Sequence, residues 1–74
     1  MEIADLINQK QIEYITERGY EPKFAYLGEI EMEALLSWAK EIFGHEVKYK
    51  STDGINFLGL KCLEVRIKNH LNIA

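Results

Sequence analysis

The sequence predicts an α+β fold in which two helices pack on one face of a small, mainly antiparallel sheet of three to four strands. Two observations predict it. The segment that ends at Phe43 carries apolar residues at the spacing of an amphipathic helix, and the segments after Gly44 contain short runs in which apolar and polar residues alternate. The expected order is therefore helix, strand, helix, strand, strand, strand, with the helices forming one layer over the sheet.

The length of the chain points to one small domain, residues 1–74. A chain this short buries only about 60% of the surface that its unfolded form exposes, so an isolated monomer would be marginally stable. Apolar residues make up 47% of the chain and charged residues 28%, which argues against disorder. We therefore expect a homodimer or docking on a protein partner.

The first helix is predicted over residues 2–18, because this segment is rich in helix formers and ends at Gly19, a typical C-cap. Its apolar residues fall on different sides of the helix: Ile3, Ile7 and Tyr14 on one, Ile12 and Ile15 on another. Either the helix is contacted on two sides or it breaks near residues 8–11. Contact on two sides would suit a protein that self-associates.

A strand and the second helix follow. Residues 24–27 are strand formers that lie between Pro22 and Gly28, and proline suits the start of a strand. The helix then extends to Phe43, and Gly44 suits a left-handed cap. The stripe predicted to face the sheet consists of Met32, Leu35, Leu36, Ala39, Ile42 and Phe43.

Two strands are expected on either side of a turn. Val47 and Tyr49 alternate with lysines, which predicts a half-buried strand over residues 45–51. Residues 52–54 end in glycine and are typical of a turn. Residues 55–58 form the next predicted strand.

The last part of the chain is predicted to complete the sheet. Leu60 and Cys62 alternate on one side of the predicted strand, whereas Leu63, Val65 and Ile67 alternate on the other. This switch predicts either a bulge near residues 62–63 or a strand that starts in a fully buried position. Leu71 and Ile73 can pair as a last strand.

Charge divides the chain into two unequal parts. The net charge is −3, but residues 1–43 carry −5 and residues 44–74 carry +2. An acidic chain disfavours nucleic acid, because such binding depends on neutralising phosphates. The alternative is a nucleic-acid-binding accessory protein that uses one basic face of the C-terminal sheet, made by Lys48, Lys50, Lys61, Arg66 and Lys68. The competing interpretation is the ordinary polar outer face of a half-buried sheet.

No residue pattern indicates catalysis, a cofactor or a metal. His45, His70 and Cys62 lie far apart and lack the spacing of metal ligands. A single cysteine excludes an internal disulfide and fits a reducing compartment. The first residues do not resemble a secretory signal, and no apolar run approaches the roughly 20 residues of a membrane span. We expect a cytoplasmic protein that is not an enzyme.

Four residues are the predicted anchors of a protein interface: Tyr14, Ile15, Tyr26 and Trp38. Tryptophan and tyrosine are enriched among the residues that dominate binding energy. The alternative is that the aromatic residues lie at the margin of the core.

The chain also resembles a known class of proteins. The motifs that carry the resemblance span roughly residues 10–67: Gly19-Tyr20-Glu21-Pro22, then Leu27-Gly28 with Glu31 or Glu33 and Leu35-Leu36, then Phe57-Leu58-Gly59-Leu60 and Leu63-x-Val65. They resemble short, mostly uncharacterised proteins of tailed phages and prophages, and a segment of tailed-phage major capsid proteins. The resemblance implies a phage-encoded binding or virion-related protein. The chain departs from capsid proteins in having no long N-terminal arm, extended loop or spine helix, so it is not expected to build a shell alone.

Overall fold

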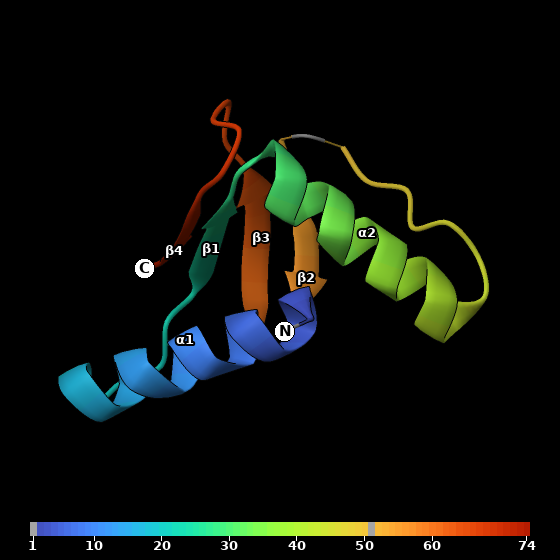
Figure 1. The fold of residues 1–74 in the computed structure, drawn as a ribbon. Helices are drawn as coiled ribbons and strands as arrows, with labels where there is room; N and C mark the ends of the chain where they lie inside the picture. The colour runs from blue at the N-terminus through green and yellow to red at the C-terminus, as the bar shows by residue number, and fades with distance from the viewer. Residues whose placement is uncertain (1, 51) are drawn as a thin grey trace.

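The computed structural model describes residues 2–50 and 52–74 of the chain, and Figure 1 shows the arrangement of its elements. The helices are α1 (Ile3–Arg18) and α2 (Glu29–Phe43), and the strands are β1 (Phe24–Leu27), β2 (Ile55–Phe57), β3 (Leu60–Glu64) and β4 (Leu71–Ile73). The predicted α+β class and the predicted order of elements are confirmed.

The four strands form one mixed sheet in the order β2-β3-β1-β4. β1 runs parallel to β3 and antiparallel to β4, and β2 and β3 form an antiparallel hairpin. Both helices lie on the same face of this sheet, as Figure 1 shows, so the other face has no helical cover among the described residues. β2 and β4 are consequently the two edges of the sheet.

The core lies between the helices and the covered face of the sheet. Alternation along β1 and β3 turns Ala25, Leu27, Leu60 and Cys62 inward, and all four are fully buried. The helices contribute Ile3 and Ile7 from α1 and Met32, Leu35 and Ala39 from α2. Burial raises the pKa of the Cys62 thiol to about 11, so this thiol stays protonated and unreactive near neutral pH.

Both helices end at a glycine with a left-handed backbone, as the sequence predicts. Gly19 has φ 76° and Gly44 has φ 77°, and each N–H caps the last turn of its helix. Of the two alternatives for the first helix, the break near residues 8–11 is absent, because α1 is continuous through this region. Its second half extends beyond β4, past the edge of the sheet (Figure 1), which explains why Ile12 and Ile15 are exposed.

A backbone joint connects the start of α2 to the β3–β4 loop. The N–H groups of Gly28 and Glu29 donate to the carbonyls of His70 and Ile67, both at 2.8 Å. In return, the backbone N–H of His70 donates to Glu31 Oε1 at 2.8 Å. The loop therefore satisfies N–H groups that the first turn of a helix leaves without partners.

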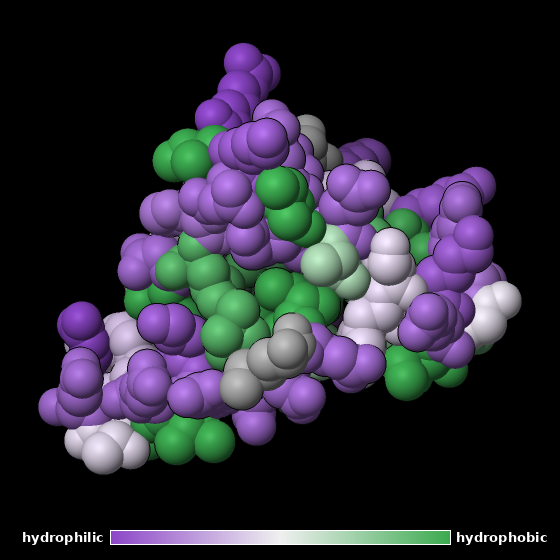
Figure 2. All heavy atoms as spheres, in the orientation of Figure 1, coloured by the Kyte–Doolittle hydropathy of each residue, from purple (hydrophilic) through white to green (hydrophobic). Residues whose placement is uncertain are grey.

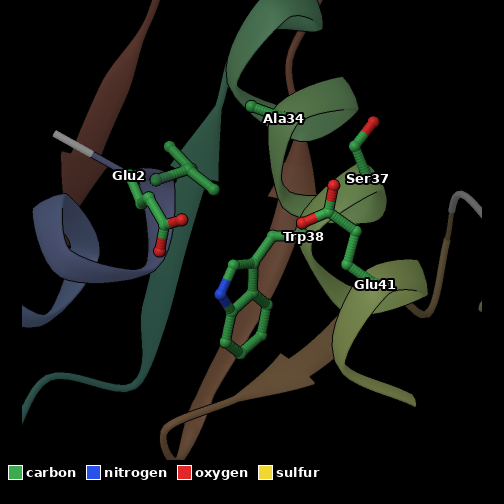
Figure 3. A pocket seen from close by; sticks show the side chains of 6 residues that line it. Glu2, Ala34, Ser37, Trp38 and Glu41 are labelled. Carbon is green, nitrogen blue, oxygen red and sulfur yellow. The ribbon is translucent and has the colours of Figure 1, made fainter. Parts of the chain in front are cut away.

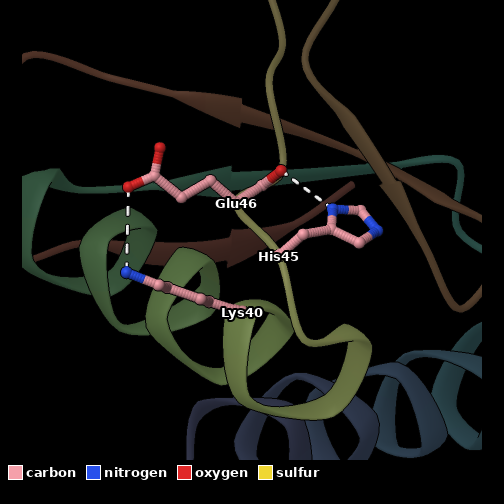
Figure 4. A network of polar contacts seen from close by, with 3 residues as sticks. All are labelled: Lys40, His45 and Glu46. Carbon is pink, nitrogen blue, oxygen red and sulfur yellow. Dashed lines mark hydrogen bonds and ion pairs between the residues drawn. The ribbon is translucent and has the colours of Figure 1, made fainter.

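The predicted strand over residues 45–51 is wrong. Within residues 45–50 no strand forms, and Ser51 lies outside the described residues. The alternation predicts burial correctly, because Val47 and Tyr49 are half-buried and the lysines between them are exposed, but the sheet offers this segment no strand to pair with. It instead returns beside α2, where Lys40 and Glu46 form an exposed ion pair at 3.8 Å and His45 Nδ1 donates to the carbonyl oxygen of Glu46 (Figure 4).

Of the two alternatives for the strand that contains Cys62, the bulge is wrong. β3 pairs with β1 in unbroken register from Lys61 to Glu64. Leu63 is half-buried on the uncovered face, opposite Tyr26. The apolar residues change sides along this strand because the uncovered face of the sheet also holds apolar side chains.

The apolar stripe of α2 is only partly buried. Ile42 and Phe43 are 61% and 60% exposed, because the last turn of the helix projects past β2 (Figure 1). In the same orientation, Figure 2 shows apolar atoms in the space between the two helices and mostly polar atoms on the outer surfaces of the helices. The helix periodicity therefore predicted the direction of the stripe, and the short sheet decided how much of it is covered.

Candidate protein-interaction surfaces

The overhanging end of α1 carries an aromatic and cationic cluster. The Tyr14 and Tyr20 rings meet edge to face at 5.6 Å between centroids, and the Arg18 guanidinium lies 4.5 Å from the centre of the Tyr14 ring. The polar interaction with Tyr20 raises the pKa of Tyr14, whereas the interactions with Tyr14 and Arg18 lower the pKa of Tyr20. These contacts order side chains that remain accessible, which lowers the entropy that a partner would have to remove.

Exposed aliphatic side chains lie on the adjacent side of α1. Ile12 and Ile15 are 56% and 36% exposed. Gln11 immediately precedes Ile12 and donates from Nε2 to the carbonyl oxygen of Leu58 at 2.9 Å. This bond brings the tip of the β2–β3 hairpin next to the helix.

Leu58 occupies a backbone conformation that is uncommon for its residue type. The two residues of the hairpin tip, Leu58 and Gly59, have φ 53° and φ 78°, as in the tight turns that favour asparagine and glycine. The Leu58 side chain is nonetheless 47% exposed and therefore gains little from burial. A strained and exposed leucine is a feature that often marks a functional surface.

The uncovered face of the sheet carries a second aromatic pair. Phe24 and Tyr26 point outward from β1 with their rings stacked at 6.2 Å and an interplanar angle of 16°. Lys61 is the register partner of Phe24 on β3, and Leu63 is the partner of Tyr26. This face therefore combines two aromatic rings with one cation.

Trp38 contributes mainly to the margin of the core. Its ring meets Phe57 of β2 at 5.1 Å, edge to face, and the residue is half-buried against the core. Trp38 also lines a shallow hollow of about 330 Å³, together with Glu2, Ser37 and Glu41 (Figure 3). This position favours the core-margin interpretation of Trp38.

The structure separates the four predicted anchors. Tyr14 and Ile15 share the overhanging end of α1, but Tyr26 lies on the uncovered sheet face. Trp38 lies over β2, the strand at the opposite edge of the sheet from β4. Sequence reasoning missed the exposed Leu58 and the outer edge of β4. A leucine in front of a glycine at a two-residue turn was the available signal for Leu58.

The five predicted basic residues are all exposed but do not share the strand face that the alternation predicted. Lys61 is the one member that lies in a strand. Lys48 and Lys50 lie in the irregular segment before β2, and Arg66 and Lys68 lie in the β3–β4 loop. The loss of a strand at residues 45–50 and the end of β3 at Glu64 are the reasons for this difference.

Among the described residues, no three His, Cys, Asp or Glu side chains are grouped so that they could share a metal ion. Neither described helix has the length and apolar character needed to cross a bilayer. No protein-family model, curated protein or solved structure matches this chain.

Proposed function

We propose that this chain is a small, non-enzymatic protein-interaction module that acts through self-association or by docking on a protein partner. The observation that carries the proposal is that both helices project past the sheet and present apolar side chains at their projecting ends. These are Ile12 and Ile15 on α1 and Ile42 and Phe43 on α2. Apolar side chains gathered at exposed ends of elements favour burial against another protein.

The size of the core supports the same proposal. Nine residues form the buried hydrophobic core among the described part of the chain, and a domain of this length has little stability to spare. Burial of the projecting ends against a partner would add to the apolar surface removed from water, at about 25 cal/mol per Å².

Site-specific photo-crosslinking tests the proposal. A photoreactive phenylalanine analogue is placed at Ile12 or at Phe43 in cells that encode the chain, and the matched control carries it at Glu33, an exposed polar position on α2. We expect a discrete crosslinked species from at least one apolar position and none from Glu33. Absence of crosslinked species at both apolar positions contradicts the proposal.

The resemblance of residues 10–67 to tailed-phage proteins supports a phage or prophage origin for the module. Its place of action would then be the host cytoplasm or the virion. We propose this origin on the quoted motifs alone.

The second candidate is single-stranded nucleic acid binding on the uncovered sheet face. The observation that favours it is the stacked Phe24–Tyr26 pair beside Lys61, since stacking on aromatic rings next to a cation is how such proteins hold bases. Fluorescence anisotropy of a labelled oligonucleotide over a salt series tests it. Binding should weaken with salt and on Phe24→Ala, and salt-independent or absent binding ends this candidate.

A further inference from the structure

β4 lies at one edge of the sheet, and half of its backbone groups point away from β1. In an antiparallel pair, residues that exchange two hydrogen bonds alternate with residues that exchange none. Phe24 and Ala74 exchange two, at 3.0 and 2.9 Å. The register places Asn72 in the next hydrogen-bonded pair, so the N–H and C=O groups of Leu71 and Ile73 point to the outer edge.

This outer edge has no partner within residues 2–50 and 52–74. In the sheet β4 pairs only with β1 among these residues, and none of their loop, turn or side-chain hydrogen bonds uses the N–H or C=O groups of Leu71 or Ile73. No proline, lysine or bulge within the three residues Leu71–Ile73 blocks strand addition. This edge is therefore a template for one more strand.

Helix α1 lies beside this edge without covering it. A hollow of about 140 Å³ separates the helix from the strand. It is lined by Leu71, Asn72 and Ile73 and by five residues of α1: Lys10, Glu13, Tyr14, Glu17 and Arg18. The helix continues past the strand (Figure 1), so any strand added to β4 would lie next to its overhanging half.

We propose that the occupant of this edge is a second copy of the chain, which pairs antiparallel with β4 about a two-fold axis beside Asn72. The inference rests on the proposed interaction function and names its partner. In this register Leu71 lies opposite Ile73 of the partner subunit, and each pair exchanges two backbone hydrogen bonds. The two four-stranded sheets become one continuous sheet.

The side chains of the strand are complementary to their own copy in this register. Leu71 and Ile73 both point to the helix-covered face, where each is half-buried. The two-fold axis places the Leu71 side chain beside Ile73 of the partner subunit, which gives two apolar cross-strand pairs. Asn72 is exposed on the other face and lies opposite Asn72 of the partner subunit, so neither face of the two paired strands brings like charges together.

The charges on α1 favour a second copy over a strongly charged peptide. The hollow contains two cations, Lys10 and Arg18, and two anions, Glu13 and Glu17, so it has no net charge to attract one sign. The two-fold axis sets the two α1 helices antiparallel. In such a pair neither helix presents a surplus of one charge to the other.

Cysteine substitution at the axis gives the most direct test. Directly opposed residues that do not exchange hydrogen bonds have Cα atoms about 4.5 Å apart, within the range of a disulfide. Asn72→Cys should therefore form a covalent dimer rapidly in air. Asn56→Cys is the matched control, because Asn56 is also exposed and lies on β2 at the opposite edge. Native Cys62 is buried and does not compete.

Light scattering over a concentration series supplies the second measurement. Wild-type chain should reach twice its monomer mass, and Asn72→Lys should weaken the dimer about tenfold, because it opposes two lysines at the axis. The circular dichroism spectrum should not change, since Asn72 is exposed. A monomeric wild type whose Asn72→Cys variant oxidises no faster than Asn56→Cys overturns the inference.

The outcomes separate this inference from the proposed function. A wild-type dimer that Asn72→Lys leaves intact uses another surface, which overturns the β4 pairing and leaves the interaction function standing. A wild-type monomer that still crosslinks to a different protein through Ile12 or Phe43 likewise overturns the pairing and keeps the interaction function. A monomer without crosslinks at either position overturns both.

Discussion

The joint between α2 and the β3–β4 loop makes a prediction about Gly28. A Cβ atom at this position would lie 2.6 Å from the backbone nitrogen of His70, 2.6 Å from the carbonyl oxygen of Ile67 and 2.7 Å from Glu31 Oε1. Two of these neighbours are backbone atoms, which cannot rotate away. Gly28→Ala therefore forces the loop to move.

The required movement sets the size of the effect. Ordinary contact begins at 3.4 Å, so the loop must retreat by about 0.8 Å from a Cβ contact of 2.6 Å. The same movement stretches the three 2.8 Å hydrogen bonds of the joint beyond useful length. At about 1 kcal/mol for each bond, we expect Gly28→Ala to lower the free energy of unfolding by about 3 kcal/mol.

Urea unfolding measures this change, with Trp38 as the reporter. Trp38 is the only tryptophan of the chain and lies half-buried against Phe57, so its fluorescence follows the packing of α2 on the sheet. Gly19→Ala is the matched control: Gly19 has φ 76°, but a Cβ atom there would meet nothing within 4 Å, so only backbone strain of about 1 kcal/mol is expected. A loss at Gly28 no larger than the loss at Gly19 would refute the steric argument.

Three further predictions concern single side chains. Leu58→Asn should raise the free energy of unfolding by about 1 kcal/mol, because asparagine tolerates φ 53° better than leucine; an unchanged or lower urea midpoint would contradict the strain at this turn. Burial raises the pKa of the Cys62 thiol from 9.0 to about 11. The protonated thiol therefore contributes fully to stability below pH 9, and this contribution is lost as the pH rises to about 11. The loss in the free energy of unfolding amounts to about 2–3 kcal/mol. Urea titrations at pH 8 and pH 11 should therefore show a smaller loss for Cys62→Ala than for wild type, and equal losses would exclude the thiol as the cause. Lys40→Ala should leave the melting temperature nearly unchanged, because the ion pair with Glu46 is long and exposed; a large decrease would show that the pair matters.

The sequence was most informative where a local rule decides the structure. The left-handed glycines end both helices where the pattern predicts, and the turn before β2 is closed by hydrogen bonds to Lys50 from Asp53 and Gly54. Helix caps and turns depend on a few adjacent residues, so the sequence predicts them without knowledge of the tertiary contacts.

The candidate surfaces were harder to predict because exposure depends on distant elements. Ile42 continues the apolar stripe of α2, yet it is exposed because no strand lies beneath the last turn. The sequence predicts Tyr14 and Ile15 as anchors on different sides of one helix, but only the overhang of this helix beyond β4 makes its end accessible. Periodicity gives the direction of a side chain and not the extent of the layer that it faces.

The sequence by itself determined the class of the fold, the order of its elements and the side of α2 that faces the core. These features follow from periods of 3.6 and 2 residues and from glycine geometry, which are local properties of the chain. The tertiary structure alone decided which strands are neighbours, which edges stay open and how far each helix overhangs. Those features depend on contacts between segments far apart in sequence, such as β1 with β3 and Gly28 with the β3–β4 loop, and such contacts leave no periodic signal in either segment.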